Sequence, residues 1–162
     1  TGVQTCALPI YDRGHGAVVL LYNRRKKTVV LTRQFRMPVY LHDGNGLLIE
    51  AAAGLLDSAS PETRIIAEAE EETGFRITHI EPVFRAFMSP GSVTEKLWFF
   101  IAEYRDEDRV SRGGGVEEEG EDIEVLEWPL KRALQAVASG EIMDAKTIML
   151  LQYLALNRTL GE

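Results

Sequence analysis

The stretch from Gly54 to Phe75, GLLDSASPETRIIAEAEEETGF, decides the fold. Its central part predicts a helix that begins at Pro61, because Ser60 can cap the free amide groups and proline suits the first helical position. Gly74 predicts the end of that helix, since glycine readily adopts the left-handed conformation that closes helices. The stretch therefore predicts one helix with a non-helical segment on each side.

Apolar, β-rich runs lie on both sides of the predicted helix. The first two are joined by a polar turn at residues 23–27 and predict a hairpin. Residues 42–46 and 105–120 are rich in glycine and polar residues and predict loops, the second of them a mobile one. The strand-like runs cover residues 17–22, 28–35, 47–52, 77–87, 97–104 and 123–128, and two further helices are predicted at 130–138 and 145–157.

The order of these elements indicates the fold class. Strands come first, then one helix, more strands and finally two helices. A sheet with helices on both faces buries the apolar sides of all these elements. We therefore predict an α/β fold, an α/β/α sandwich whose sheet is mixed rather than regularly parallel.

Composition is typical of an ordinary soluble domain. The 162 residues are 45% hydrophobic and 27% charged, which suffices for one domain with a core. No apolar run reaches the roughly 20 residues that span a bilayer, so no membrane association is expected. The net charge of −7 argues against nucleic-acid binding, which needs a basic face. The single Cys6 excludes an intrachain disulfide and fits a reducing, cytoplasmic location.

The first ten residues, TGVQTCALPI, show neither a helical nor a strand period. We interpret residues 1–10 as a non-native or disordered leader, with a frayed natural tail as the alternative, and leave them out of the fold prediction. The predicted domain spans residues 11–162, and its N-terminal strand region is expected to be truncated.

Three glutamates of the predicted helix point to a metal site. Glu68 and Glu72 are four residues apart and share a helix face, and Glu71 lies beside them. Crowded carboxylates raise one another's pKa values unless a cation lies among them. Hard oxygen ligands favour Mg²⁺, or Mn²⁺, and Mg²⁺ often completes its shell with substrate phosphates. The alternative is a solvated, glutamate-rich face without a ligand.

The same stretch resembles the Nudix box, which opens on a glycine and closes on the pattern R-E-U-x-E-E-x-G-U, where U is bulky and apolar. Gly54 matches the opening, and the closing half is matched by Glu68, Glu71, Glu72, Gly74 and Phe75. Ser60 stands where a glutamate is usual, Ala67 replaces an arginine that braces the glutamates, and the spacing between Gly54 and Glu68 is one residue short. The resemblance implies the Nudix fold.

Segments outside the box resemble the branch of that family that hydrolyses nucleoside-diphosphate sugars. They include YDRGHGAVVLLYN, VVLTRQFR, MSPGSVTE and GEIMDAKT, and Pro90 follows Gly74 at the sixteen-residue spacing of that branch. The resemblance implies Mg²⁺-dependent hydrolysis of a diphosphate, with GDP-mannose converted to GMP and mannose 1-phosphate. Two alternatives stay open: an ADP-ribose or ADP-sugar pyrophosphatase, and a catalytically silent nucleotide-binding Nudix domain.

The resemblance also implies a role for each matching position. A homodimer is implied as well. The Ala53 carbonyl would bind metal together with Glu68, Glu71, Glu72 and Glu121, of which Glu72 and Glu121 are the catalytic residues, and the substrate would be bound by Arg36, Gly54, Leu55, Glu95 and Lys146.

Some of these assignments have plain alternatives. Arg33, Arg36 and Lys146 are open to interpretation as ordinary surface cations. The acids at 117–119 are interpreted as a solvated charge run, and Glu121 is preferred to Glu119 because it lies closer to the following strand.

Overall fold

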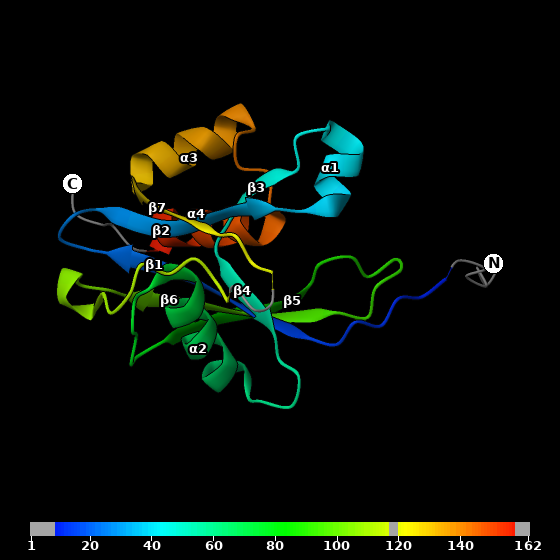
Figure 1. Cartoon of the computed structure of the whole chain (residues 1–162), viewed down its shortest axis with the longest axis horizontal. Helices are drawn as coiled ribbons and strands as arrows, with labels where there is room; N and C mark the ends of the chain where they lie inside the picture. Colours follow the sequence, from blue (N-terminus) through cyan, green and yellow to red (C-terminus); the bar gives the residue numbers. More distant parts are fainter. Residues whose placement is uncertain (1–8, 117–119, 158–162) are drawn as a thin grey trace.

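The computed structural model describes residues 9–116 and 120–157 (Figure 1). The residues at 117–119, whose interpretation as a charge run was made above, lie outside this range, as do residues 1–8 of the interpreted leader. The strands are β1 (Gly16–Asn23), β2 (Thr28–Phe35), β3 (Leu47–Glu50), β4 (Ala52–Leu55), β5 (Glu81–Phe87), β6 (Lys96–Glu103) and β7 (Glu124–Pro129). The helices are α1 (Met37–Asp43), α2 (Pro61–Thr73), α3 (Leu130–Ser139) and α4 (Ala145–Asn157), with a short 3₁₀ turn η1 at Asp106–Asp108.

The strands join in one mixed sheet with β1 at its centre. The sheet runs in the order β3-β2-β1-β6-β5, with β4 paired to β1 and β7 to β2. Only β1 and β6 pair in parallel among these strands, and the other pairs are antiparallel. Strand β4 pairs with Gly16–Val19 and β2 with Leu21–Asn23. One edge of β1 is therefore shared by two strands, and the sheet divides beside it.

Helices cover both faces of the sheet, which confirms the predicted α/β/α sandwich. Helix α2 lies on one face and α3 and α4 lie on the other (Figure 1). Both faces of β1 are consequently buried: Val18 and Leu20 belong to the core under α3 and α4, while Val19 packs with Ile65 and Ala69 of α2. None of the helices in the described ranges combines the length and apolar character needed to cross a membrane.

Helix α2 begins and ends where the local signals predict. The Ser60 hydroxyl accepts a hydrogen bond from the Thr63 amide at 3.2 Å, and Pro61 occupies the first turn. At the other end Gly74 adopts a φ of 78° and its amide donates to the carbonyl of Glu70 at 2.9 Å. These two caps fix which residues of α2 face the sheet and which face its divided edge.

Three predicted segments differ from the structure. The loop expected at 42–46 is preceded by the short helix α1, which buries none of its residues. The run at 47–52 is two strands that separate at Ala51, because β3 pairs with β2 and β4 with β1. The strand expected from residue 77 begins only at Glu81. Tyr11, next to the interpreted leader, forms a bridge with Val93.

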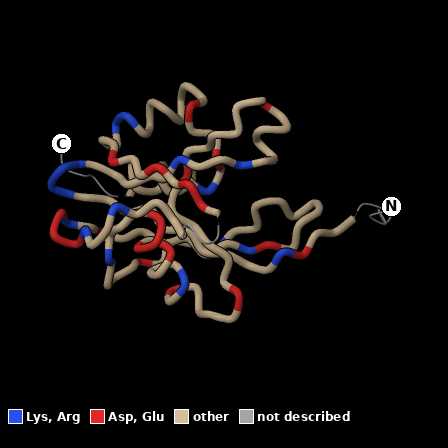
Figure 2. The backbone as a smooth tube through the Cα atoms, viewed as in Figure 1, with Lys and Arg blue, Asp and Glu red and all other residues tan. Residues whose placement is uncertain are grey.

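Acidic and basic residues are intermixed along the described backbone (Figure 2). Several ion pairs link separate elements, such as Arg33 of β2 with Glu124 of β7. The charge that surrounds a given side chain therefore depends on its ion-pair partners more than on the net charge of the chain.

Candidate active site

A cavity of about 640 Å³ opens where the sheet divides beside β1. Its wall combines residues of β1, α1, β3, β4, α2, β6 and the start of α4 with residues of the connecting segments. Nine of the ten predicted site residues line it, namely Arg36, Ala53, Gly54, Leu55, Glu68, Glu71, Glu95, Glu121 and Lys146. The fold thus brings together positions that span more than a hundred residues of sequence, while their individual roles stay predictions.

The tenth predicted residue, Glu72, lies behind the wall of the cavity. Its side chain is buried, and Oε2 accepts a hydrogen bond from the Ala53 amide at 3.3 Å. Burial raises the pKa of Glu72 to about 8, and the charges of Glu68 and Glu121 contribute to the rise. Helix α2 therefore holds a carboxyl group that is costly to ionise unless a cation joins it.

Glu68 is held in place from two sides. Its carboxyl group lies against Gly54, and a Cβ atom at position 54 would overlap it. On the other side Arg64 contacts Glu68 Oε1 at 2.5 Å and donates from Nε to the Leu55 carbonyl at 3.3 Å. Arg64 thus links the end of β4 to α2, one turn before Ala67, where the Nudix pattern has its arginine. The four-residue spacing of Arg64 and Glu68 is the sequence signal that could have found this contact.

The glycine-rich segment before β7 is anchored on the C-terminal end of α2. The Gly114 amide donates to the Glu72 carbonyl at 2.9 Å and the Gly115 amide to the Glu71 carbonyl at 3.1 Å. Gly113, with a φ of 69°, approaches the backbone of residues 72–74 so closely that no side chain would fit. Gly113 therefore serves close backbone packing, and the mobility predicted for the loop at 105–120 stays a prediction.

This anchored segment carries Glu121 to the cavity. Glu121 Oε2 accepts a hydrogen bond from the Val116 amide at 2.9 Å. Within the described residues the other oxygen, Oε1, has no hydrogen-bond partner. Glu121 therefore presents a carboxylate oxygen to the cavity, whereas its competitor Glu119 lies outside the described ranges.

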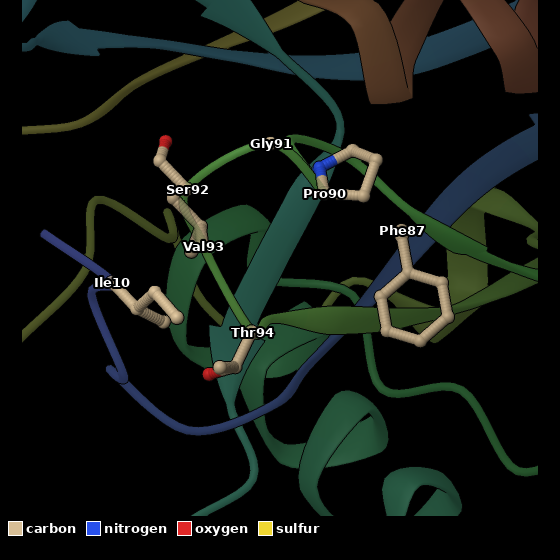
Figure 3. Close-up of a pocket in the computed structure, with 7 residues that line it drawn as sticks. All are labelled: Ile10, Phe87, Pro90, Gly91, Ser92, Val93 and Thr94. Carbon is tan, nitrogen blue, oxygen red and sulfur yellow. The ribbon is translucent and has the colours of Figure 1, made fainter. Parts of the chain in front are cut away.

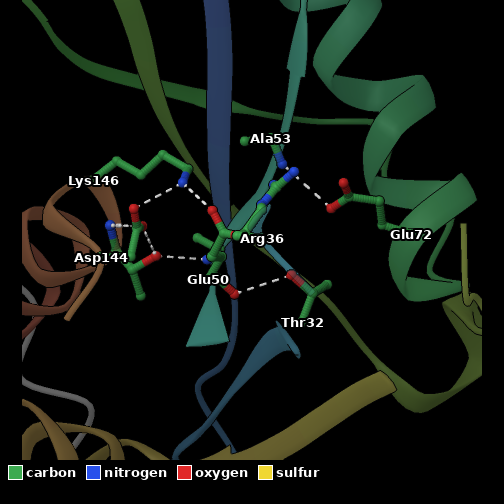
Figure 4. Close-up of polar contacts among 9 residues, drawn as sticks. Thr32, Arg36, Glu50, Ala53, Glu72, Asp144 and Lys146 are labelled. Atoms are coloured by element: carbon green, nitrogen blue, oxygen red, sulfur yellow. Dashed lines mark hydrogen bonds and ion pairs between the residues drawn. The ribbon is translucent and has the colours of Figure 1, made fainter. Parts of the chain in front are cut away.

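Glu50 is a site residue that sequence reasoning missed. It is 3% exposed, and each of its oxygens accepts a hydrogen bond from a cation (Figure 4). Arg36 Nε lies 2.7 Å from Oε2, and Lys146 Nζ lies 2.5 Å from Oε1 and 2.9 Å from Asp144. The available signal was a single acid within the apolar run at 47–53.

The start of α4 is tied to the break between β3 and β4. Asp144 Oδ2 accepts a hydrogen bond from the Thr147 amide at 3.0 Å, as a helix cap does. The Thr147 hydroxyl in turn accepts from the Ala51 amide at 2.7 Å. These bonds direct Lys146 into the cavity, where its side chain is only 14% exposed. Burial alone would lower the pKa of Lys146, but the charges of Glu50 and Asp144 outweigh it and raise the pKa.

The alternative of plain surface cations applies to Arg33 and not to Arg36. Arg33 pairs with Glu124 across the exposed side of β2 and β7 and does not line the cavity. Arg36 pairs with buried Glu50. Burial works to lower the pKa of Arg36, and the hydrogen bond and charge of Glu50 more than offset it, so the pKa is raised.

Glu95 and Pro90 lie in different hollows. Glu95 is 15% exposed and pairs with Arg13 at 3.4 Å. Pro90, the family hallmark, lines a second hollow of about 430 Å³, whose lining residues Figure 3 labels. This hollow shares none of its lining residues with the main cavity, so the structure separates Pro90 from the predicted acids.

The acids fit a divalent cation by their chemistry. Glu68, Glu72 and Glu121 are hard oxygen donors whose mutual repulsion a cation would relieve. The Ala53 amide points to Glu72 and away from β1, and in an antiparallel pair the carbonyl of the same residue faces the same side. In residues 9–116 and 120–157 no three potential ligands already converge into a closed metal shell.

Fold and site together have the features that define a Nudix domain: a mixed sheet between helices and a glutamate-bearing helix beside β4. The chain is 55% identical over 153 residues to a GDP-mannose pyrophosphatase of Salmonella arizonae, covering 94% of this chain and 79% of that protein. It is 57% identical over 153 residues to a GDP-mannose pyrophosphatase of Pectobacterium atrosepticum, covering 94% and 78%. The corresponding protein of Klebsiella pneumoniae is 56% identical over 146 residues, covering 90% and 73%.

No family model matches the chain. The length and identity of the matches to curated relatives decide the assignment. The chain belongs to the GDP-mannose pyrophosphatase family of Nudix enzymes.

Proposed function

We propose that this chain hydrolyses the diphosphate of GDP-mannose to GMP and mannose 1-phosphate. The observation that carries the proposal is one cavity in which the cations Arg36 and Lys146 face the acids Glu68 and Glu121. Relatives at 55–57% identity are named for this substrate, which favours it over the ADP-ribose and ADP-sugar alternatives.

The side chains divide the work of hydrolysis between them. Arg36 and Lys146 bind the diphosphate oxygens, since guanidinium and ammonium groups match phosphate charge. Glu121 accepts the proton of the attacking water, and Glu95 accepts hydrogen bonds from substrate hydroxyl groups. Gly54 and Leu55 contact the substrate through their backbone, and the missing side chain at position 54 makes room for the Glu68 carboxyl group beside it.

Mg²⁺, or Mn²⁺, is the proposed cofactor. When bound, such an ion neutralises charge on the diphosphate oxygens. Glu68, Glu72 and the Ala53 carbonyl are the proposed ligands, with Glu71 nearby, and Glu121 is the alternative ligand if it is not the base. The support for this is the raised pKa of Glu72, whose causes are burial and the neighbouring acids.

The substrate is tested by incubating the chain with GDP-mannose, ADP-ribose and ADP-glucose in parallel, with and without Mg²⁺, and identifying products by mass. The proposal expects Mg²⁺-dependent GMP and mannose 1-phosphate, formed faster than AMP from either adenine substrate. Faster AMP release would move the substrate to the ADP-sugar class. No turnover of any substrate would leave the silent nucleotide-binding domain as the function.

Arg64→Ala is expected to lower kcat/KM roughly 10- to 100-fold, the usual effect of losing a partner that orients a metal-binding side chain. The reason is that Glu68 loses its ion pair and its tie to the Leu55 carbonyl. Steady-state kinetics across a Mg²⁺ titration measure it, and more Mg²⁺ should be needed for half-maximal rate. Arg76→Ala is the matched control, because Arg76 pairs with Glu70 on the exposed side of α2. Equal rates for the two variants would contradict the bracing role.

Assembly and location complete the proposal. By resemblance the active form is a homodimer, which light scattering after size exclusion would test. The partner is a small nucleotide sugar, and the net charge of −7 supports the absence of nucleic-acid and membrane partners. Cys6 as the single cysteine supports a cytoplasmic location.

A further inference from the structure

Glu50 is a buried acid whose two oxygens are both occupied by cations from distant parts of the chain. Arg36 comes from the turn between β2 and α1, and Lys146 from the first turn of α4. Figure 4 shows the Glu50 carboxylate between these two side chains. All three residues line the main cavity. With both oxygens engaged, Glu50 is a holder of the two cations rather than a ligand in its own right.

Arg36 and Lys146 each have N–H groups left over that can donate hydrogen bonds to a ligand. Arg36 gives Nε to Glu50, and its terminal Nη groups make no hydrogen bond to any residue in the described ranges. Lys146 gives two of its three N–H groups to Glu50 and Asp144. A guanidinium that is fixed through Nε presents two parallel donors, which is the geometry that binds a phosphate through two oxygens.

We propose that Glu50 is the positioning residue of this site: it clamps Arg36 and Lys146 side by side so that their free donors meet the two phosphates of a diphosphate. Two neighbouring cations repel each other. A carboxylate between them attracts both, which offsets the repulsion and holds them close together. The proposal deepens the proposed function and rests on it for the identity of the substrate, although the clamp itself is defined by the contacts of Glu50.

The structure also indicates which cation depends more on the clamp. Lys146 would keep Asp144 if the Glu50 charge were removed. Arg36 would lose its only ion-pair partner among the described residues. Neutralising Glu50 should therefore imitate the loss of Arg36 more closely than the loss of Lys146. A residue that only stabilised the fold would show no such preference.

The test measures binding of inorganic diphosphate by calorimetry, in chelator, to the unsubstituted chain, Glu50→Gln, Arg36→Ala and the double variant. We expect Glu50→Gln to weaken binding roughly 10- to 100-fold, as the loss of an orienting partner does. In the Arg36→Ala background the same substitution should have much less effect, because the group that it orients is gone. Glu124→Gln is the matched control: it removes the partner of Arg33, which does not line the cavity, and binding should not change.

Glu50→Asp covers the case in which Glu50→Gln fails to fold, which thermal melting would reveal. This variant keeps the negative charge but withdraws the carboxylate by one methylene, so it should fold, bind diphosphate more weakly and again show little effect when Arg36 is absent. Unchanged binding by the folded Glu50 variant would overturn the inference, and so would an equal loss with and without Arg36.

Turnover of GDP-mannose separates this inference from the proposed function. A chain that binds diphosphate with the expected pattern but releases no GMP would refute the proposed function and leave the clamp standing. If the unsubstituted chain turns over GDP-mannose and Glu50→Gln keeps the same kcat/KM and diphosphate binding, the clamp is refuted and the proposed function stands. A failure of the unsubstituted chain to bind diphosphate at all would overturn the clamp, because the two cations would then not form a phosphate site.

Discussion

Glu72→Gln is expected to raise the melting temperature of the metal-free protein near pH 8 while lowering turnover. The Glu72 side chain is 3% exposed, and burial with the charges of Glu68 and Glu121 raises its pKa to about 8. A glutamine keeps an oxygen for the Ala53 amide but has no charge to bury. Turnover with Mg²⁺ should fall roughly 10²- to 10³-fold, the range for losing one electrostatic contributor to a transition state.

The sign of the pH effect follows from the direction of the shift. In the unfolded chain Glu72 loses its proton near the ordinary glutamate pKa of 4.5, and in the folded chain it keeps the proton up to about 8. The folded state binds more protons between these values, so the metal-free protein loses stability as the pH rises through that window. Glu72→Gln removes this loss. The stability difference between variant and parent should therefore grow from about pH 5 to about pH 8.

Thermal melting in chelator at several pH values, with parallel kinetics in Mg²⁺, measures both effects. Glu70→Gln is the control, since Glu70 lies on the same helix but at the surface, where Arg76 lowers its pKa. That control should gain no stability and keep its turnover. A Glu72→Gln variant that melts below the parent at every pH, or that keeps normal turnover, would remove Glu72 from the site.

The parts of the fold that sequence could predict are those with local causes. Helix α2 carries its own boundaries in Ser60 and Gly74, so both of its ends could be predicted from local sequence. The break between β3 and β4 has a distant cause, because the Ala51 amide is bound by Thr147, which lies 96 positions along the chain. Helix α1 buries none of its residues, so its sequence has no apolar periodicity from which a helix could be predicted.

The same distinction holds for the site. Glu68, Glu71 and Glu72 share a helix face, and their spacing alone predicts that they gather. The role of Glu50 depends on its ion pairs with Arg36 and Lys146, which β2 and α4 bring to it from distant parts of the sequence. No short-range pattern could have supplied those partners. An isolated acid in an apolar run is a signal that something must neutralise it, but it does not say what.

The second large effect is expected for Glu121→Gln, which should lower kcat about 10²- to 10⁴-fold, the range for removing a general base. The substitution is nearly isosteric, and the glutamine oxygen can still accept the hydrogen bond from the Val116 amide. The anchored segment should therefore stay on α2, and KM for GDP-mannose should change little. Asp122→Asn is the control: its side chain is exposed and outside the cavity, so its kcat should match that of the parent.

A Mg²⁺ titration of Glu121→Gln decides which of two roles Glu121 has. If Glu121 holds the metal, a higher concentration of Mg²⁺ should restore much of the lost rate, because weakened binding is overcome by mass action. If Glu121 accepts the proton of water, the rate should stay low at every concentration, since no added cation replaces a missing base. A kcat within about threefold of the parent would place the base elsewhere, because loss of a general base costs far more than that.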